Sequence, residues 1–185
     1  MKEIAEKVAT LLALTTAQRL QTLELINIKN IEKSSSAVRI KITEQIKTSR
    51  PGAMQPELVL PFFEKKPGLC VASAVLEYVE ITKKLRGKDT EELFVSTMKP
   101  FKAVSSQTIG HWVKSLLGKA GVDTEKFTAY STRHAAVSAA HKRGMDISII
   151  RRSAGWTESS QTFFKFYNRP IAASEEQFAK VVLNL

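Results

Sequence analysis

The sequence lacks the features that would place a protein outside the cell or in a membrane. It contains one cysteine, Cys70, so no disulfide can form within the chain and a disulfide-stapled secreted domain is excluded. No run of about eighteen apolar residues occurs, which argues against a membrane-spanning helix. The N-terminal stretch MKEIAEKVATLLAL has neither the basic start nor the cleavage site of a signal peptide. We therefore expect an intracellular protein in which Cys70 is a buried, unreactive thiol.

The sequence also lacks the motifs of common cofactor-dependent enzymes. No GxxxxGK[ST] phosphate-binding loop is present, so we expect no use of ATP. His134 and His141 are seven residues apart, but no cysteine or glutamate partner completes a zinc site. We therefore expect neither a metal ion nor an organic cofactor.

Positive charge is what the sequence has in excess. The 185 residues carry 28 Lys and Arg against 18 Asp and Glu, a net charge of +10. More than half of this excess lies in residues 126–169, where the acids are Asp146 and Glu158. The basic residues there are Lys126, Arg133, Lys142, Arg143, Arg151, Arg152, Lys165 and Arg169. Such a concentration favours a polyanionic partner, and nucleic acid in particular, over a general contribution to solubility.

Hydrophobic spacing predicts one mainly helical α+β domain over residues 1–185, with a small antiparallel sheet of three strands. Helices are expected over residues 3–23, 70–85, 105–119, about 130–144 and 146–153, in a short segment carrying Tyr167, and over 172–185. Strands are expected at 25–28, 38–42 and 58–60, with a further extended piece at 93–96. Ser105 and Asp146 are the expected N-caps of their helices, and Gly155 is an expected terminator.

Several side chains suited to phosphodiester chemistry lie along this pattern. Arg133 and His134 begin one helix, Trp156 follows the end of another, and Tyr167 lies eleven residues further on. An arginine can grip two phosphate oxygens, an indole N–H can donate to one, and a phenol oxygen can attack phosphorus. Arg19, in an apolar helix, and Lys47, before the Pro51-Gly52 turn, add two further cations.

Each of these residues also has an ordinary structural interpretation. Tyr167 can be a packing residue among the phenylalanines of FFKFYNRP, and Trp156 can be a packing anchor. Arg133 can belong to a structural salt bridge, because an unpaired buried charge is unfavourable. Arg19 can lie exposed beside two glutamines on a polar helix face, and Lys47 can be a solvated charge at a hairpin.

Four stretches together resemble the catalytic domain of the tyrosine recombinase, or phage integrase, family. LTTAQRLQTLEL resembles the first arginine box, and IKTSRPG resembles the β-hairpin that carries a lysine. AYSTRHAAVSAA resembles the His-x-x-Arg box, and AGWTESSQTFFKFYNRP resembles the box that ends in the nucleophile. The likeness spans about residues 5–170 and is closer to the recombinases of eukaryotic mobile elements of the DIRS and Crypton kind.

The resemblance implies a role for each of these residues in breaking and rejoining DNA. Tyr167 would attack the scissile phosphate and become linked to a 3′ end. Arg19 and Arg133 would clamp the non-bridging oxygens, and Lys47 would protonate the departing 5′ oxygen. Trp156 would fill a position that is His or Trp across the family. Contacts to double-stranded DNA are expected from basic residues around this chemistry: Arg50, Lys142, Arg143, Arg151, Arg152, Lys165 and Arg169.

Two departures from the family pattern bear on activity. Tyr130 stands where the family most often has histidine, and His134 is the residue expected to assist it. The tryptophan-to-tyrosine gap is eleven residues, where nine is commoner. We also expect the helical N-terminal domain of family members to be absent. The resemblance further implies a nuclear setting and a homotetramer on DNA, with no membrane association.

Two other functions stay open at this point. The chain can be a domesticated DNA-binding module whose catalysis is lost, which Tyr130 favours. It can also be a basic helical interaction domain unrelated to DNA, which the concentrated charge of residues 126–169 disfavours.

Overall fold

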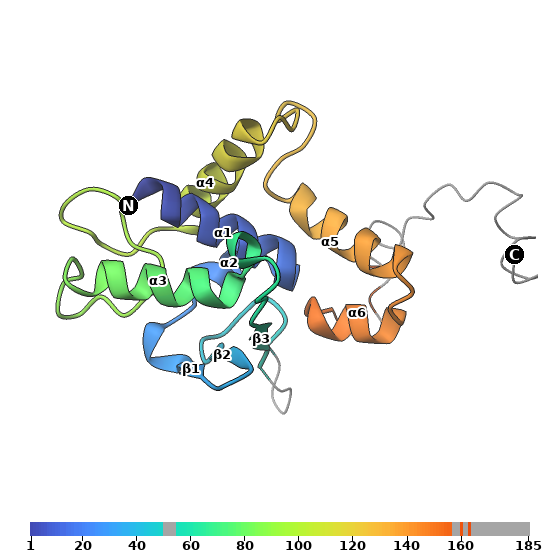
Figure 1. Ribbon diagram of the computed structural model, residues 1–185, viewed down its shortest axis with the longest axis horizontal. Coiled ribbons are helices and arrows are strands. Elements are labelled where there is room, and N and C mark those ends of the chain that lie inside the picture. Colours follow the sequence, from blue (N-terminus) through green and yellow to red (C-terminus); the bar gives the residue numbers. More distant parts are fainter. Residues whose placement is uncertain (50–54, 157–159, 161–162, 164–185) are drawn as a thin grey trace, which may run out of the picture.

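The computed structural model describes residues 1–49, 55–156, 160 and 163 (Figure 1). The helices are α1 Lys2–Thr16, α2 Leu20–Glu24, α3 Val71–Lys83, α4 Ser106–Lys119, α5 Ser131–Lys142 and α6 Ile147–Ser153. Two short 3₁₀ turns, η1 Ile28–Asn30 and η2 Pro67–Leu69, accompany the strands β1 Ile31–Lys33, β2 Ala37–Lys41 and β3 Glu57–Pro61. The prediction of a mainly helical domain with a three-stranded sheet is confirmed. The helices expected around Tyr167 and over 172–185 lie outside the described residues.

The sheet is antiparallel, in the order β1-β2-β3, so each strand neighbours the next along the chain. Val38 pairs with Leu60 and Ile40 with Leu58, and all four side chains are buried while the residues between them are exposed. The first strand was predicted at 25–28, and that prediction is wrong. The side chain of Asn27 accepts a hydrogen bond from Lys29 N at 2.8 Å, which starts the 3₁₀ turn η1 and delays the strand to Ile31.

The helix predicted over 3–23 is divided in two. Ala17 adopts a left-handed conformation, with φ of 51°, and ends α1. Arg19 is extended and serves as the N-cap residue of α2, so its carbonyl accepts the first hydrogen bonds of that helix, from Thr22 N and Leu23 N. The apolar positions before and after the break continue on one side, because Leu12, Leu20 and Leu23 are all buried. Periodicity alone therefore did not reveal the break.

The main hydrophobic cluster lies where α1 packs against α3 and α4, with the buried face of the sheet alongside. Tyr78, Phe94 and Trp112 form a chain of ring contacts in it, at centroid distances of 5.9 and 6.1 Å. Cys70 is buried, as expected, and its sulfur accepts hydrogen bonds from Phe63 N and Ser73 Oγ. No helix in the described part of the chain is long and apolar enough to cross a membrane.

A second, smaller hydrophobic cluster joins α5 and α6 to the end of α1 (Figure 1). Its buried members are Ala17, Val137, Ile150, Ala154 and Phe163. The side chain of Asp146 accepts a hydrogen bond from Ser148 N at 2.7 Å and caps α6, as the sequence predicted. This cluster places the α1–α2 break beside the start of α5 and the end of α6.

Candidate functional site

Arg133 is the centre of the candidate site. It lies in the first turn of α5 and is 4% exposed, and its Nη1 donates a hydrogen bond to the carbonyl oxygen of Ala17 at 2.6 Å. Its guanidinium carbon lies 3.5 Å from the centroid of the Trp156 ring, which is a close cation–π contact. Three segments that are far apart in sequence thus meet at one buried cation: the α1–α2 break, α5 and the end of α6.

Arg19 enters this region through its backbone. It follows Ala17 by two residues, so its Cα lies within roughly 7 Å of the Cα whose carbonyl binds Arg133. Arg19 lies in the break as the N-cap residue of α2, and its partly buried side chain makes no capping hydrogen bond. The two arginines expected to share a phosphate therefore come from neighbouring backbone segments.

Tyr130 is linked to the same neighbourhood. It is the N-cap residue of α5 and is 55% exposed, and its phenol oxygen accepts a hydrogen bond from Gln21 Nε2 at 3.4 Å. Gln21 follows Arg19 by two residues in α2. The phenol of Tyr130 therefore lies beside the first turn of α2, within reach of solvent.

Gln18 was not singled out as a functional residue by the sequence, yet it is buried in the site. Its Nε2 donates a hydrogen bond to the carbonyl oxygen of Ser153 at 2.9 Å, and so joins the α1–α2 break to the last turn of α6. The one signal in the sequence was its position directly before Arg19. That signal cannot distinguish a buried glutamine from one on a polar helix face.

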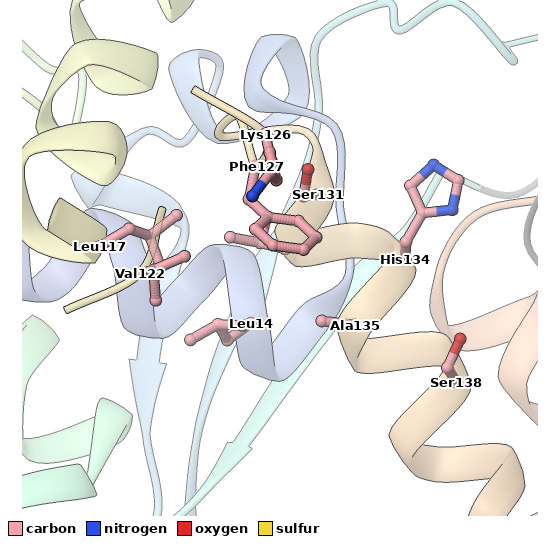
Figure 2. Close-up of a pocket in the computed structure, with 10 residues that line it drawn as sticks. Leu14, Leu117, Val122, Lys126, Phe127, Ser131, His134, Ala135 and Ser138 are labelled. Carbon is pink, nitrogen blue, oxygen red and sulfur yellow. The ribbon is translucent and has the colours of Figure 1, made fainter. Parts of the chain in front are cut away.

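His134 faces a different part of the molecule from Arg133. Adjacent residues on a helix point about 100° apart, and His134 lines a cavity of about 560 Å³ between α5, the end of α1 and the loop after α4. Figure 2 shows its ring at the edge of this cavity, apart from the apolar side chains of Leu14, Leu117 and Val122. His134 therefore lines this cavity, whereas Arg133 does not.

Lys47 lies in the connection between β2 and β3, as the sequence indicated. A turn closes around it, because Ser49 N donates to Ile46 O at 2.9 Å and Ile46 N donates to Ser49 Oγ at 2.8 Å. Its side chain is exposed, and among the described residues no hydrogen bond joins it to the Arg133 cluster. Arg50, the next basic residue of this connection, lies outside the described residues.

The basic residues at the ends of α5 and α6 differ in their exposure. Lys142, Arg143 and Arg152 are exposed, whereas Arg151 is partly buried with its guanidinium carbon 5.8 Å from the ring centroid of Phe163. Phe163 in turn packs edge-on against Trp156, with ring centroids 5.0 Å apart. Tyr167, Lys165 and Arg169 lie outside the described residues. In the described ranges, no three His, Cys, Asp or Glu side chains gather closely enough to hold a metal ion.

Comparison with known proteins by sequence identifies a family. Residues 1–173 match the Phage integrase family. Over 90 residues the chain is 30% identical to the tyrosine recombinase XerC of Caldanaerobacter subterraneus subsp. tengcongensis, a match that covers 48% of this chain and 25% of XerC. The chain thus spans about a quarter of the length of the curated relative it matches.

Solved structures share the fold at low sequence identity. XerA recombinase aligns with a TM-score of 0.63 and 18% identity, covering 100% of this chain and 63% of XerA. XerH site-specific recombinase bound to difH substrate aligns with a TM-score of 0.68 and 15% identity, over 97% of this chain and 46% of XerH. A lambda integrase dimer bound to a COC′ core site gives 0.59 and 17%, over 92% and 43% of the two chains. These likenesses confirm the predicted fold class.

Proposed function

The chain belongs to the phage integrase family, and from that premise we propose that it breaks and rejoins DNA strands through a 3′-phosphotyrosine intermediate. The observation that carries this proposal is the convergence at Arg133. A buried guanidinium held by Ala17 O and stacked on Trp156 is a rigid cation, and its position beside the Arg19 segment suits the grip of one phosphate by two arginines.

The proposed reaction exchanges one phosphoester bond for another. The phenol oxygen of Tyr167 attacks phosphorus while its proton passes to water, and the bond from phosphorus to the 5′ oxygen breaks. Lys47 supplies the proton that the departing 5′ oxygen takes up. Forming a phenolate near neutral pH costs roughly 4 kcal/mol, so cations beside the tyrosine are needed to lower that cost.

Charge stabilisation in the transition state falls to the arginines and Trp156. Preorganised donors of this kind are typically worth about 3 kcal/mol each when the site excludes water. Arg133 is already held in place before DNA binds, which supports such preorganisation. Because the phosphotyrosine conserves the bond energy, rejoining in the proposed reaction needs neither ATP nor a metal ion.

The finer features of the proposal concern assembly and origin. We place Arg50, Lys142, Arg143, Arg151, Arg152, Lys165 and Arg169 against the DNA backbone. The active assembly would be a homotetramer on paired DNA sites, in a nuclear setting, with relatives among mobile elements of the DIRS and Crypton kind. His134, four residues after Tyr130 and so on the same side of α5, would assist it.

The experiment that tests the proposal traps the covalent intermediate. The protein is incubated with a pool of randomised DNA duplexes that carry a phosphorothiolate bridge, which leaves a 5′ thiol that cannot rejoin. Protein-linked DNA is isolated under denaturing conditions, the attached residue is mapped by mass spectrometry, and the attached DNA is sequenced. We expect an adduct at Tyr167.

The matched control is Tyr167→Phe, which removes only the phenol oxygen. It should abolish the adduct and leave DNA binding intact. An adduct that persists in this variant would place the nucleophile elsewhere. Salt-sensitive DNA binding with no adduct from the unaltered protein would identify a DNA-binding module that has lost its chemistry.

A further inference from the structure

We propose that Gln18 is a positioning residue that fixes the Arg19 segment relative to Trp156 in the candidate site. Gln18 is 3% exposed, and a buried amide is unfavourable unless its polar atoms are hydrogen-bonded. Its Nε2 meets this requirement by donating to Ser153 O at 2.9 Å, across 135 residues of sequence. The contribution of Gln18 to strand cleavage rests on the proposed function. The hydrogen bond that links Gln18 to Ser153 does not depend on that function.

The partner of Gln18 is a carbonyl at the end of α6 that accepts no backbone hydrogen bond from the residues the structure describes. The last four carbonyls of a helix have no partner within the helix. In α6, the carbonyl of Ile150 accepts from Ala154 N, that of Arg152 from Gly155 N, and that of Arg151 from Trp156 N. The remaining carbonyl of the four, that of Ser153, accepts from Gln18. The glutamine therefore completes the C-terminal cap of the helix that leads into Trp156.

Gly155 shows that the two segments are in close contact at this point. Its φ is 72°, and a Cβ added there would lie 3.3 Å from Gln18 Oε1 and 3.7 Å from Nε2. The glutamine side chain thus packs directly on the residue that precedes Trp156. A shift of the amide would move Gly155, and with it the ring that lies against Arg133.

The contacts form a closed circuit through the three segments of the site. Gln18 holds the end of α6 through Ser153, Trp156 stacks on Arg133, and Arg133 donates back to Ala17, the residue before Gln18. Arg19 follows at once and begins α2. A circuit of this kind restrains the distance between Arg19 and the Arg133–Trp156 pair more tightly than any one of its contacts would.

The first test follows the link in the protein without DNA. In Gln18→Met the side chain keeps its length but cannot donate to Ser153. Two-dimensional ¹H–¹⁵N NMR then compares the indole N–H of Trp156 and the Nε–H of Arg19 with those of the unaltered protein. We expect both signals to shift and the indole signal of Trp112, the other tryptophan, to stay in place. Unchanged signals from Arg19 and Trp156 would overturn the inference.

The matched control is Gln107→Met, on the exposed side of α4, which should move neither signal. If Gln18→Met fails to fold, Gln18→Glu replaces it as the tested variant. A glutamate retains the shape of glutamine and regains a donor only when it is protonated. The Arg19 and Trp156 signals of Gln18→Glu should therefore return towards their original positions as the pH falls, and a pH-independent displacement would contradict the proposal.

The second test measures cleavage of the DNA sequence recovered in the trapping experiment. A misplacement of about 1 Å can cost roughly 100-fold in rate, so we expect Gln18→Met to slow single-turnover cleavage by about 10- to 100-fold while DNA affinity is retained. Substrate with a neutral methylphosphonate at the scissile position needs less cationic stabilisation. The variant's defect should be smaller on it, whereas a general structural defect would slow both substrates equally and overturn the inference.

The two tests separate failure of the inference from failure of the proposed function. If the unaltered protein forms no adduct, the proposed function fails and the NMR comparison alone decides whether Gln18 links the segments. If the unaltered protein cleaves DNA and Gln18→Met cleaves both substrates at the same rates, the function stands and the positioning role is wrong.

Discussion

Glu6 is a buried carboxylate that ties α1 to α4. Its Oε2 accepts from Lys119 Nζ at 2.6 Å and its Oε1 from Ser115 Oγ at 2.9 Å. Burial raises the pKa of Glu6, but the hydrogen bonds from Lys119 and Ser115 outweigh it and leave the pKa below its ordinary value of 4.5. A lowered folded-state pKa means that the stabilisation is present above about pH 4.5 and is lost as the pH falls through the folded-state value.

Lys119→Met should therefore destabilise the fold in a pH-dependent way. Breaking a fully buried ion pair costs roughly 3–5 kcal/mol, but Lys119 is half exposed and its charge is screened, so we expect a loss of about 1–2 kcal/mol at neutral pH. The difference in free energy of unfolding between the variant and the unaltered protein should become smaller as the pH falls, because Glu6 becomes protonated. Urea unfolding at several pH values measures it. Lys83→Met, which removes an exposed partner of Glu80, is the control, and a loss as large there would contradict the argument.

Two glycines in equivalent positions isolate the contact made by Gln18. Gly144 and Gly155 each follow the C-cap of a helix, with φ of 82° and 72°. A Cβ at Gly144 would meet nothing within 4 Å, whereas one at Gly155 would press on the Gln18 amide. Gly144→Ala should cost about 1–2 kcal/mol from its left-handed backbone alone, and Gly155→Ala should cost more. Thermal unfolding measures the loss of stability in each variant. Equal losses would show that the Gln18 amide moves aside from the added methyl group at no cost.

At the scale of elements, α4 is capped by a residue of another helix. Ser106 N in its first turn donates to Glu24 Oε2 at 2.9 Å, whereas the side chain of its N-cap residue, Ser105, makes no capping hydrogen bond. A carboxylate suits a helix N-terminus because it accepts from a free N–H and faces the positive end of the dipole. The cap therefore couples α2, which carries the Arg19 segment, to α4.

Glu24→Ala should consequently cost more than Ser105→Ala, although the sequence favours Ser105 as the cap. We expect a loss of about 1 kcal/mol for Glu24→Ala and less than about 0.5 kcal/mol for Ser105→Ala. Hydrogen exchange should also speed up in the first turn of α4 in the Glu24 variant. A larger effect of Ser105→Ala would show that the serine caps α4 in solution.

Elements with strong local signals could be predicted from the sequence, and those set by distant contacts could not. The helices α3, α4 and α6 lie within two residues of their predicted bounds, since apolar spacing is regular there and Asp146 caps α6. The break at Ala17 was missed because its residues carry no glycine or proline, and the left-handed turn is held from outside by Arg133. For the same reason, the sequence suggested Arg133 and Trp156 as site residues but did not reveal the Gln18 link.

At the scale of the whole molecule, the excess positive charge is concentrated in one part of the chain, residues 126–169. Lys142 and Arg143 are exposed at the end of α5, which stands apart from α3 on the far side of the domain (Figure 1). DNA binding releases counterions in proportion to the phosphates that are neutralised, with a slope of roughly 0.9 for each. Residues that touch DNA can thus be told from residues that only add charge.

The double variant Lys142→Gln, Arg143→Gln should lower the salt dependence of DNA binding. If each residue neutralises one phosphate, the slope of log K against log salt falls by roughly 1.8. Fluorescence anisotropy with a duplex of arbitrary sequence at several salt concentrations measures it. Lys84→Gln, Lys88→Gln removes the same charge at the end of α3 and beyond it, and an equal change there would point to net charge alone.

The two hydrophobic clusters differ in size and support different parts of the molecule. Most of the sheet and α1, α3 and α4 rest on the larger one, while the end of α6 and the Trp156 ring depend on the smaller. The proposed site, formed by the Arg19 segment, Arg133 and Trp156, lies where the smaller cluster meets the end of α1. Cooperative units with few buried contacts open at lower free energy than the rest. On warming, the protein is therefore expected to lose DNA cleavage before it unfolds, at temperatures where circular dichroism still registers most of its helix.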